Sequence, residues 1–145
     1  MNIYVDADAC PVKDEVVRVA ERHNIQVIMV ADGGLRPSRD SLVRMHIVPQ
    51  GADAADDWIA ENITISDICV TSDIPLAKRC LDRGAVAIKP NGNLFNEANI
   101  GMALAMRDLK QHIRESQQTQ TYNASFTKSD RSNFLQALDR LIQQR

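Results

Sequence analysis

The most restrictive feature of this chain is an almost continuous apolar run at residues 25–31, Ile-Gln-Val-Ile-Met-Val-Ala. A strand of this composition is covered on both faces, because a strand with one wet face alternates apolar and polar side chains. Burial on both faces is typical of parallel sheets that lie between helices. The run therefore predicts a buried strand in a mostly parallel sheet, ended by the turn-forming residues Asp32, Gly33 and Gly34.

Strand and helix patterns alternate around this run. Further strands, rich in β-branched and apolar residues, are predicted at residues 2–6, 42–49, 68–71 and 85–89. Helices, with apolar spacing of the helical period, are predicted at residues 11–23, 52–62, 75–83 and 98–114. The alternation predicts an α/β three-layer sandwich with a mostly parallel central sheet. In the helix at residues 98–114 we expect four residues to face the core, namely Ile100, Ala103, Leu104 and Leu109.

The end of the chain has a different composition. Residues 116–128 begin with a polar, Gln- and Thr-rich stretch and are predicted to form a flexible linker between a domain at residues 1–115 and a helix at residues 129–145. The apolar stripe of that helix comprises Phe134, Leu135, Leu138, Leu141 and Ile142. Docking of this stripe on the domain is favoured over pairing with a second subunit, which would give a homo-oligomer.

Composition limits the classes of function. The 19 acidic and 17 basic residues argue against a broad cationic surface for duplex DNA and permit one local basic patch. The three cysteines show no zinc-ligand spacing, which is typical of reduced thiols in a cytosolic protein. No basic region precedes a long apolar stretch, and no segment approaches the ~20 apolar residues of a membrane span. We therefore expect a cytoplasmic protein that does not contact membranes.

Acidic residues follow three of the predicted strands. Asp6 and Asp8 follow the first, Asp53 and Asp57 the third, and Asp73 the fourth. Ligands of α/β sheets bind beyond the carboxyl ends of the strands, so these acids are expected to converge there. Carboxylates in one pocket repel one another unless a hard cation such as Mg²⁺ or Mn²⁺ binds between them. The pattern predicts a metal site for phosphodiester hydrolysis, with Asp6, Asp8 and Asp73 as catalytic residues.

Some of these acids have a simpler explanation, because Asp is favoured at helix N-termini for capping alone. Asp53 and Asp73 could each be a plain cap. Asp56 is expected to be solvated rather than coordinating, since its neighbour Asp57 competes for the same role. Residues that could bind a nucleic-acid backbone lie near the same strand ends, and these are Lys13, Arg36, Arg39, Ser72, Lys78 and Lys89.

Four segments of the chain resemble the uncharacterised bacterial YaiI/YqxD family over most of residues 1–115. They are Val5-Asp-Ala-Asp-Ala-Cys-Pro-Val-Lys13, Gly34-Leu-Arg-Pro-Ser-Arg39, Gly51-Ala-Asp-Ala-Ala-Asp-Asp-Trp-Ile59 and Val70-Thr-Ser-Asp-Ile-Pro-Leu-Ala77. That family is grouped with PIN-like domains, which are metal-dependent nuclease folds. The resemblance implies that Asp6 is the acid of the first strand, Asp53 or Asp57 the helix acid, and Asp73 the acid of a Thr-x-Asp motif.

One departure from the PIN pattern leaves alternatives open. Many PIN nucleases carry a further acid after the next strand, where this chain has Lys89-Pro-Asn-Gly92, so Asp8 would have to replace it. Without that acid the same cleft could bind RNA or a partner without cleaving it. Asp6-Ala-Asp8 also resembles the nucleophile motif of haloacid-dehalogenase-type phosphatases, but Asp57 precedes Thr71, which is the wrong motif order. A metal-dependent nuclease acting on single-stranded nucleic acid, RNA in the first instance, is the favoured function.

Overall fold

The computed structural model describes residues 1–33, 40–51, 53–117 and 126–144. Its strands are β1 (Asn2–Asp6), β2 (Gln26–Ala31), β3 (Val43–Ile47), β4 (Ile68–Val70) and β5 (Val86–Ile88). Its helices are α1 (Lys13–His23), α2 (Ala54–Asn62), α3 (Ile74–Asp82), α4 (Glu97–Gln117) and α5 (Lys128–Gln143), with a short 3₁₀ turn, η1 (Ala7–Ala9), after β1. The predicted α/β class is confirmed, and each predicted element is present with bounds shifted by up to three residues.

The five strands form one parallel sheet in the order β3-β2-β1-β4-β5. The chain runs outward from β1 to β3 and then crosses back to β4 on the other side of β1. The strand order therefore reverses between β1 and β4, and the carboxyl ends of strands at such a switch point are where α/β sheets bind ligands. Val5 of β1 lies level with Val70 of β4, so the residues after them, Asp6 and Thr71, are neighbours at this point.

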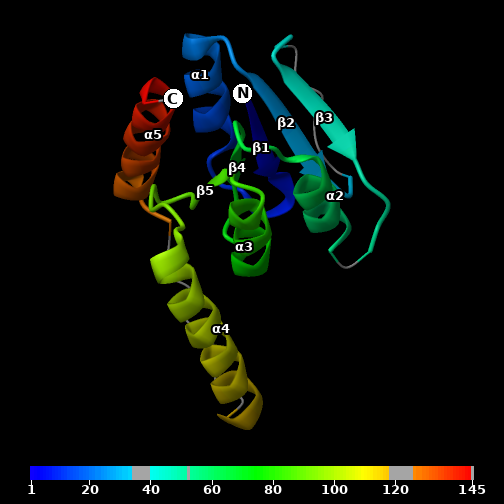
Figure 1. Ribbon diagram of the computed structural model, residues 1–145, viewed down its shortest axis with the longest axis vertical. Coiled ribbons are helices and arrows are strands. Elements are labelled where there is room, and N and C mark those ends of the chain that lie inside the picture. The colour runs from blue at the N-terminus through cyan, green and yellow to red at the C-terminus, as the bar shows by residue number, and fades with distance from the viewer. Residues whose placement is uncertain (34–39, 52, 118–125, 145) are drawn as a thin grey trace.

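Helices cover both faces of the sheet, as Figure 1 shows. On one face α1 and α5 lie side by side over a core that includes Ile3 and Val5 of β1. On the other face α2 and α3 cover a second core that includes Tyr4. Because side chains alternate between faces along a strand, Asp6 projects on the same face as Tyr4, toward α2 and α3.

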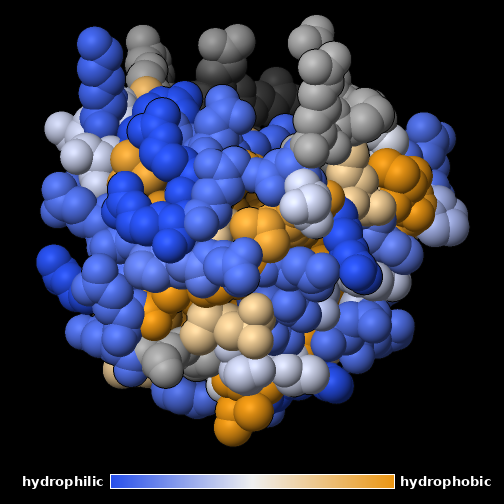
Figure 2. All heavy atoms as spheres, turned by 90° about the horizontal axis from the view of Figure 1, so that it is seen from above, coloured by the Kyte–Doolittle hydropathy of each residue, from blue (hydrophilic) through white to orange (hydrophobic). Residues whose placement is uncertain are grey.

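The opposite edge of the sheet is formed by the amino ends of the strands. Figure 2 views the molecule from this end and shows a mostly hydrophilic surface with scattered apolar patches. The exposed apolar residues Met1 and Ile65 precede β1 and β4. Within the described part of the chain, no helix is both long and apolar enough to cross a membrane.

Helix α4 is only partly packed on the domain. Ile100 is buried with Phe95, against Ala77 of α3 and Ala87 of β5. The prediction that Leu109 faces the core is wrong, since 51% of its surface is exposed. Figure 1 shows the reason: beyond its first turns α4 extends away from the sheet, so its later turns lie away from the cores on the two sheet faces.

Helix α5 docks on the domain, which was the favoured of the two alternatives. Its apolar stripe enters the core beside α1, where Phe134 and Leu138 are fully buried. An ion pair between Arg131 and Glu15 and a 2.7 Å hydrogen bond between His23 and Asp139 join the two helices. This stripe is therefore not free for a second subunit. The predicted linker at residues 116–128 lies mostly outside the described residues, although α4 continues to residue 117.

Candidate functional site

Thr71 joins the ends of β1 and β4 at the switch point. Its side chain is buried, and its hydroxyl donates a hydrogen bond of 3.2 Å to Oδ2 of Asp6. The same hydroxyl oxygen accepts a 2.9 Å hydrogen bond from the backbone N–H of Asp73. One buried hydroxyl thus orients the strand acid and fixes the start of α3. Sequence reasoning quoted Thr71 only as part of a motif and gave it no role.

Asp6 lies in an environment that disfavours its charge. Burial is the main cause that raises the pKa of this carboxyl, and the negative charges of Asp73 and Asp8 raise it further. The hydrogen bond from Thr71 lowers this pKa, and its effect is smaller than that of burial but larger than that of either charge. Among the described residues Asp6 forms no ion pair. In the part of the chain that the structure describes, the strand-end acid therefore has no ion-pair partner to offset the effect of burial.

Asp73 is a helix cap, as one of its two explanations required. Its Oδ1 accepts a 2.8 Å hydrogen bond from the backbone N–H of Leu76, and Pro75 follows in the first turn of α3. Capping occupies only one of the two carboxylate oxygens. The charge of Asp73 also raises the pKa of Asp6 and of Asp56, an effect second to burial at Asp56. Capping and a role in the acidic site are thus compatible for this residue.

The two adjacent acids of α2 differ from expectation in their burial. Asp57 is exposed, and its Oδ1 accepts a 2.7 Å hydrogen bond from Arg79 of α3. Asp56, which we expected to be solvated, is partly buried and faces Asp6 and Asp73. Burial and then these neighbouring charges raise its pKa to about 6. The expectation that Asp56 is solvated was wrong, because α2 places this side chain in a partly buried position and leaves that of Asp57 exposed beside Arg79.

Asp53 and Asp8 lie at the edge of the site. Asp53 precedes α2 with a left-handed backbone, φ 63°, and its side chain makes no capping hydrogen bond. Its explanation as a plain side-chain cap is therefore wrong, although Asp is among the residues that tolerate this conformation. Asp8 is exposed in η1, and its Oδ2 accepts a long, 3.4 Å hydrogen bond from the backbone N–H of Asp32.

A cavity of about 230 Å³, here called the acidic pocket, opens among these side chains. Its lining residues are Asp53, Asp56, Asp57, Asp73, Pro75, Leu76, Arg79 and Arg107. Four carboxylates thus face two guanidinium groups, of which the one of Arg79 is already paired with Asp57. In the part of the chain that the structure describes, no three carboxylate, imidazole or thiolate side chains are close enough to hold one metal ion as they stand. Side chains would have to turn inward to do so.

The predicted phosphate-binding residues differ in their surroundings. Lys78 is paired with Asp82 at 2.6 Å, and the ammonium of Lys89 lies 5.1 Å from the ring centroid of Phe95. Lys13 begins α1 and is partly exposed, and Ser72 is exposed directly after Thr71. Arg36 and Arg39 lie outside the described residues. Sequence reasoning missed the two arginines of the acidic pocket, Arg79 and Arg107.

Comparison with known proteins assigns the family. The sequence model described as "Uncharacterized BCR, YaiI/YqxD family" matches residues 4–144. The chain belongs to the YaiI/YqxD family. The match extends through α5, so the docked C-terminal helix is part of what this family shares in sequence.

Curated relatives match over nearly their whole length. A UPF0178 protein of Rhizobium meliloti is 60% identical over 139 residues, which cover 96% of this chain and 95% of the relative. A UPF0178 protein of Agrobacterium fabrum is 57% identical over 139 residues, covering 96% of this chain and 91% of the relative. A UPF0178 protein of Parvibaculum lavamentivorans is 52% identical over 142 residues, covering 98% and 93%. The YaiI/YqxD domain thus constitutes most of each of these proteins.

Proposed function

We propose that this protein is a PIN-like nuclease that uses Mg²⁺ or Mn²⁺ to hydrolyse phosphodiester bonds of single-stranded nucleic acid, with RNA as the expected substrate. The observation that carries the proposal is that Asp56 and Asp73 line one cavity beside the switch point of a parallel sheet, where Asp6 ends β1. Burial and mutual repulsion raise the pKa of Asp6 and of Asp56. A divalent cation would remove that repulsion, and carboxylate oxygens are the ligands that it prefers.

The donor set agrees with such a cation in chemistry, since its side chains are all carboxylates, although in the described residues no three of them are gathered around one point. Asp6, Asp56 and Asp73 would hold it, with Asp8 and Asp53 at the rim, while Asp57 is engaged with Arg79. When bound, the ion supplies positive charge that stabilises a phosphoryl transition state and lowers the pKa of a bound water. The residues of the chain would contribute orientation, because Thr71 fixes Asp6 and the helix cap fixes one oxygen of Asp73.

The test is cleavage of fluorescein-labelled single-stranded RNA and DNA oligonucleotides in the presence of Mg²⁺, Mn²⁺ or EDTA. We expect cleavage of the RNA that requires the metal and falls by at least about a hundredfold in Asp6→Asn. The matched control is Asp108→Asn, which makes the same change at an exposed position of α4 and should leave the rate unchanged. No cleavage of any oligonucleotide in a broad panel would reject the proposal.

A binding module without catalysis is the second candidate. Two observations favour it: the segment after β5, Lys89 to Asn91, contains no acid, and no three ligands are already gathered in the described residues. This candidate predicts RNA binding that Asp8→Asn leaves unchanged and no turnover with any metal. The cleavage assay, run beside a binding titration of the same RNA, separates the two.

A further inference from the structure

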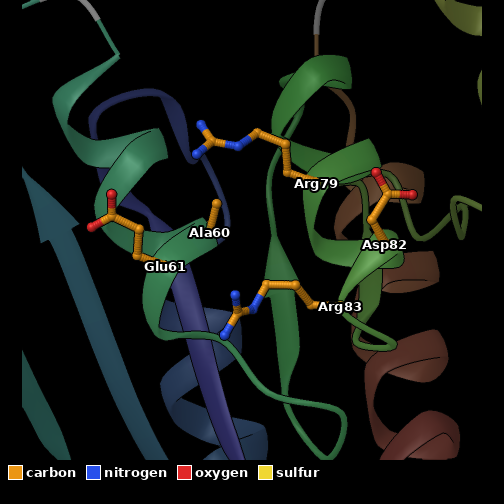
Figure 3. A pocket seen from close by; sticks show the side chains of 5 residues that line it. All are labelled: Ala60, Glu61, Arg79, Asp82 and Arg83. Atoms are coloured by element: carbon orange, nitrogen blue, oxygen red, sulfur yellow. The ribbon is translucent and has the colours of Figure 1, made fainter.

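A second cavity of about 270 Å³, here called the arginine cavity, lies between α2 and α3 (Figure 3). Its lining residues are Ala60, Glu61, Arg79, Asp82 and Arg83. Arg79 lines the acidic pocket as well, so the two cavities share one wall. A strand of nucleic acid whose phosphate lies at the acidic pocket therefore has the arginine cavity beside it.

Two guanidinium groups extend into this cavity. Arg79 and Arg83 are four residues apart at the end of α3, a spacing that places them on one helix face. Figure 3 shows both groups directed from α3 toward α2, whereas the carboxylates of Glu61 and Asp82 are directed away from them. Asp82 is in addition paired with Lys78 at 2.6 Å. The side chains directed into the space between the two helices are therefore the two guanidinium groups.

The hydrogen bonds leave donors free on this wall. Nη1 of Arg79 donates to Oδ1 of Asp57 at 2.7 Å, which holds the side chain against α2. Nε of Arg83 donates to the backbone carbonyl of Ile63 at 2.9 Å. Among the described residues the structure gives no partner to the terminal nitrogens of Arg83. This guanidinium is thus fixed by one bond and retains two nitrogens that can donate to a ligand.

We propose that the arginine cavity binds a backbone phosphate adjacent to the phosphate at the acidic pocket, with Arg83 as the principal contact and Arg79 as the second. A guanidinium presents parallel N–H donors that match two oxygens of one phosphate. The inference rests on the proposed function for the class of ligand, since the acidic pocket accounts for the neighbouring phosphate. It assigns to α3 a role in binding the strand that none of the predicted basic residues fills.

The test is the salt dependence of binding, measured without metal so that cleavage plays no part. Fluorescence anisotropy of a labelled single-stranded octauridylate is followed in EDTA at a series of salt concentrations for the wild-type protein and for Arg83→Gln. Each phosphate contact contributes about 0.7 to the slope of log K against log salt for a single strand. We expect Arg83→Gln to lower the slope by about this amount and to weaken binding about tenfold at low salt.

Two further variants separate a phosphate contact from other effects. Arg140→Gln removes the same charge from an exposed position of α5, across the sheet, and should retain the wild-type slope. Arg83→Lys keeps the charge and should also retain it. The proposal is overturned by an unchanged slope in Arg83→Gln, by equal loss in Arg83→Gln and Arg83→Lys, by equal loss in Arg140→Gln, or by absence of wild-type binding. Cleavage is measured separately. Cleavage by the wild-type protein with an unchanged slope in Arg83→Gln rejects only phosphate binding in the arginine cavity. A lowered slope in Arg83→Gln without cleavage rejects only the proposed nuclease activity.

Discussion

Replacing Asp56 by Asn should stabilise the metal-free protein. The pKa of this carboxyl is raised from 3.8 to about 6 by burial and by the charges of Asp6 and Asp73. A shift of roughly two pH units corresponds to about 3 kcal/mol for a fully desolvated group. The Asp56 side chain is partly exposed, so solvent screening reduces the figure to about 1 kcal/mol. Loss of a negative charge from the first turn of α2 costs a few tenths of a kcal/mol in return.

The effect of Asp56→Asn on the free energy of unfolding depends on pH. Below 3.8 the carboxyl is protonated in both the folded and the unfolded state, and its charge costs nothing. As the pH rises to about 6 the unfolded state loses its proton first, so the free energy of unfolding falls. The advantage of Asp56→Asn is therefore complete above about pH 6 and disappears as the pH falls toward 3.8.

The assay is urea unfolding in EDTA at about pH 8 and about pH 4, where we expect the midpoint for Asp56→Asn to exceed wild type by about half a molar only at the higher pH. Asp108→Asn, on the exposed part of α4, should leave the midpoint unchanged at both. Saturating Mn²⁺ should raise the midpoint of the wild-type protein more than that of Asp56→Asn. A lower urea midpoint for Asp56→Asn than for the wild-type protein at about pH 8 would refute the inference that the charge of Asp56 destabilises the folded state.

Four further variants test the fold. Phe134→Ala should lower the free energy of unfolding by about 3–5 kcal/mol in urea, because this buried ring anchors α5; a loss under about 1 kcal/mol would show that α5 is dispensable. Gly92→Ala should lower it by at least about 1 kcal/mol, since φ is +94° and the new Cβ would lie 2.8 Å from the backbone of Asn133. Gly101→Ala, with open space around a helical glycine, should instead raise it by about 1 kcal/mol, and equal effects of the two glycine variants would contradict this reading. Asp67→Asn should cost about 1–3 kcal/mol in thermal unfolding, because the buried carboxylate accepts three hydrogen bonds, and a neutral result would contradict it.

The strands were predictable because short runs of apolar residues indicate buried strands. The apolar run at residues 25–31 became β2 (Gln26–Ala31), which is buried on both faces at nearly every position. The helices followed from apolar spacing and from Pro75 near the start of α3. The order of the strands and the reversal between β1 and β4 were not predicted. They depend on which apolar faces meet in space, and spacing along the chain does not encode that.

The wrong predictions concern residues whose local sequence pattern is compatible with two different tertiary surroundings. Leu109 belongs to an amphipathic helix, but amphipathicity does not tell whether the domain or the solvent lies against the later turns. Asp56 and Asp57 are adjacent, so a rotation of α2 about its axis by about 100° decides which of the two side chains is the more buried. That rotation is fixed by packing and by Arg79, which lies 22 residues away in sequence from Asp57. The order of strands and helices was enough to predict acids at the strand ends. Tertiary contacts decide which of two adjacent acids is buried, and the sequence does not show them.

We propose that the acids at the switch point hold a divalent metal ion, and isothermal titration of Mn²⁺ into the wild-type protein, Asp6→Asn and Asp73→Asn measures this binding. We expect a saturable site in the wild-type protein and affinity at least about tenfold weaker in both variants, with Asp108→Asn unchanged. Equal affinity in the wild-type protein and Asp6→Asn, or no saturable binding at all, would contradict it.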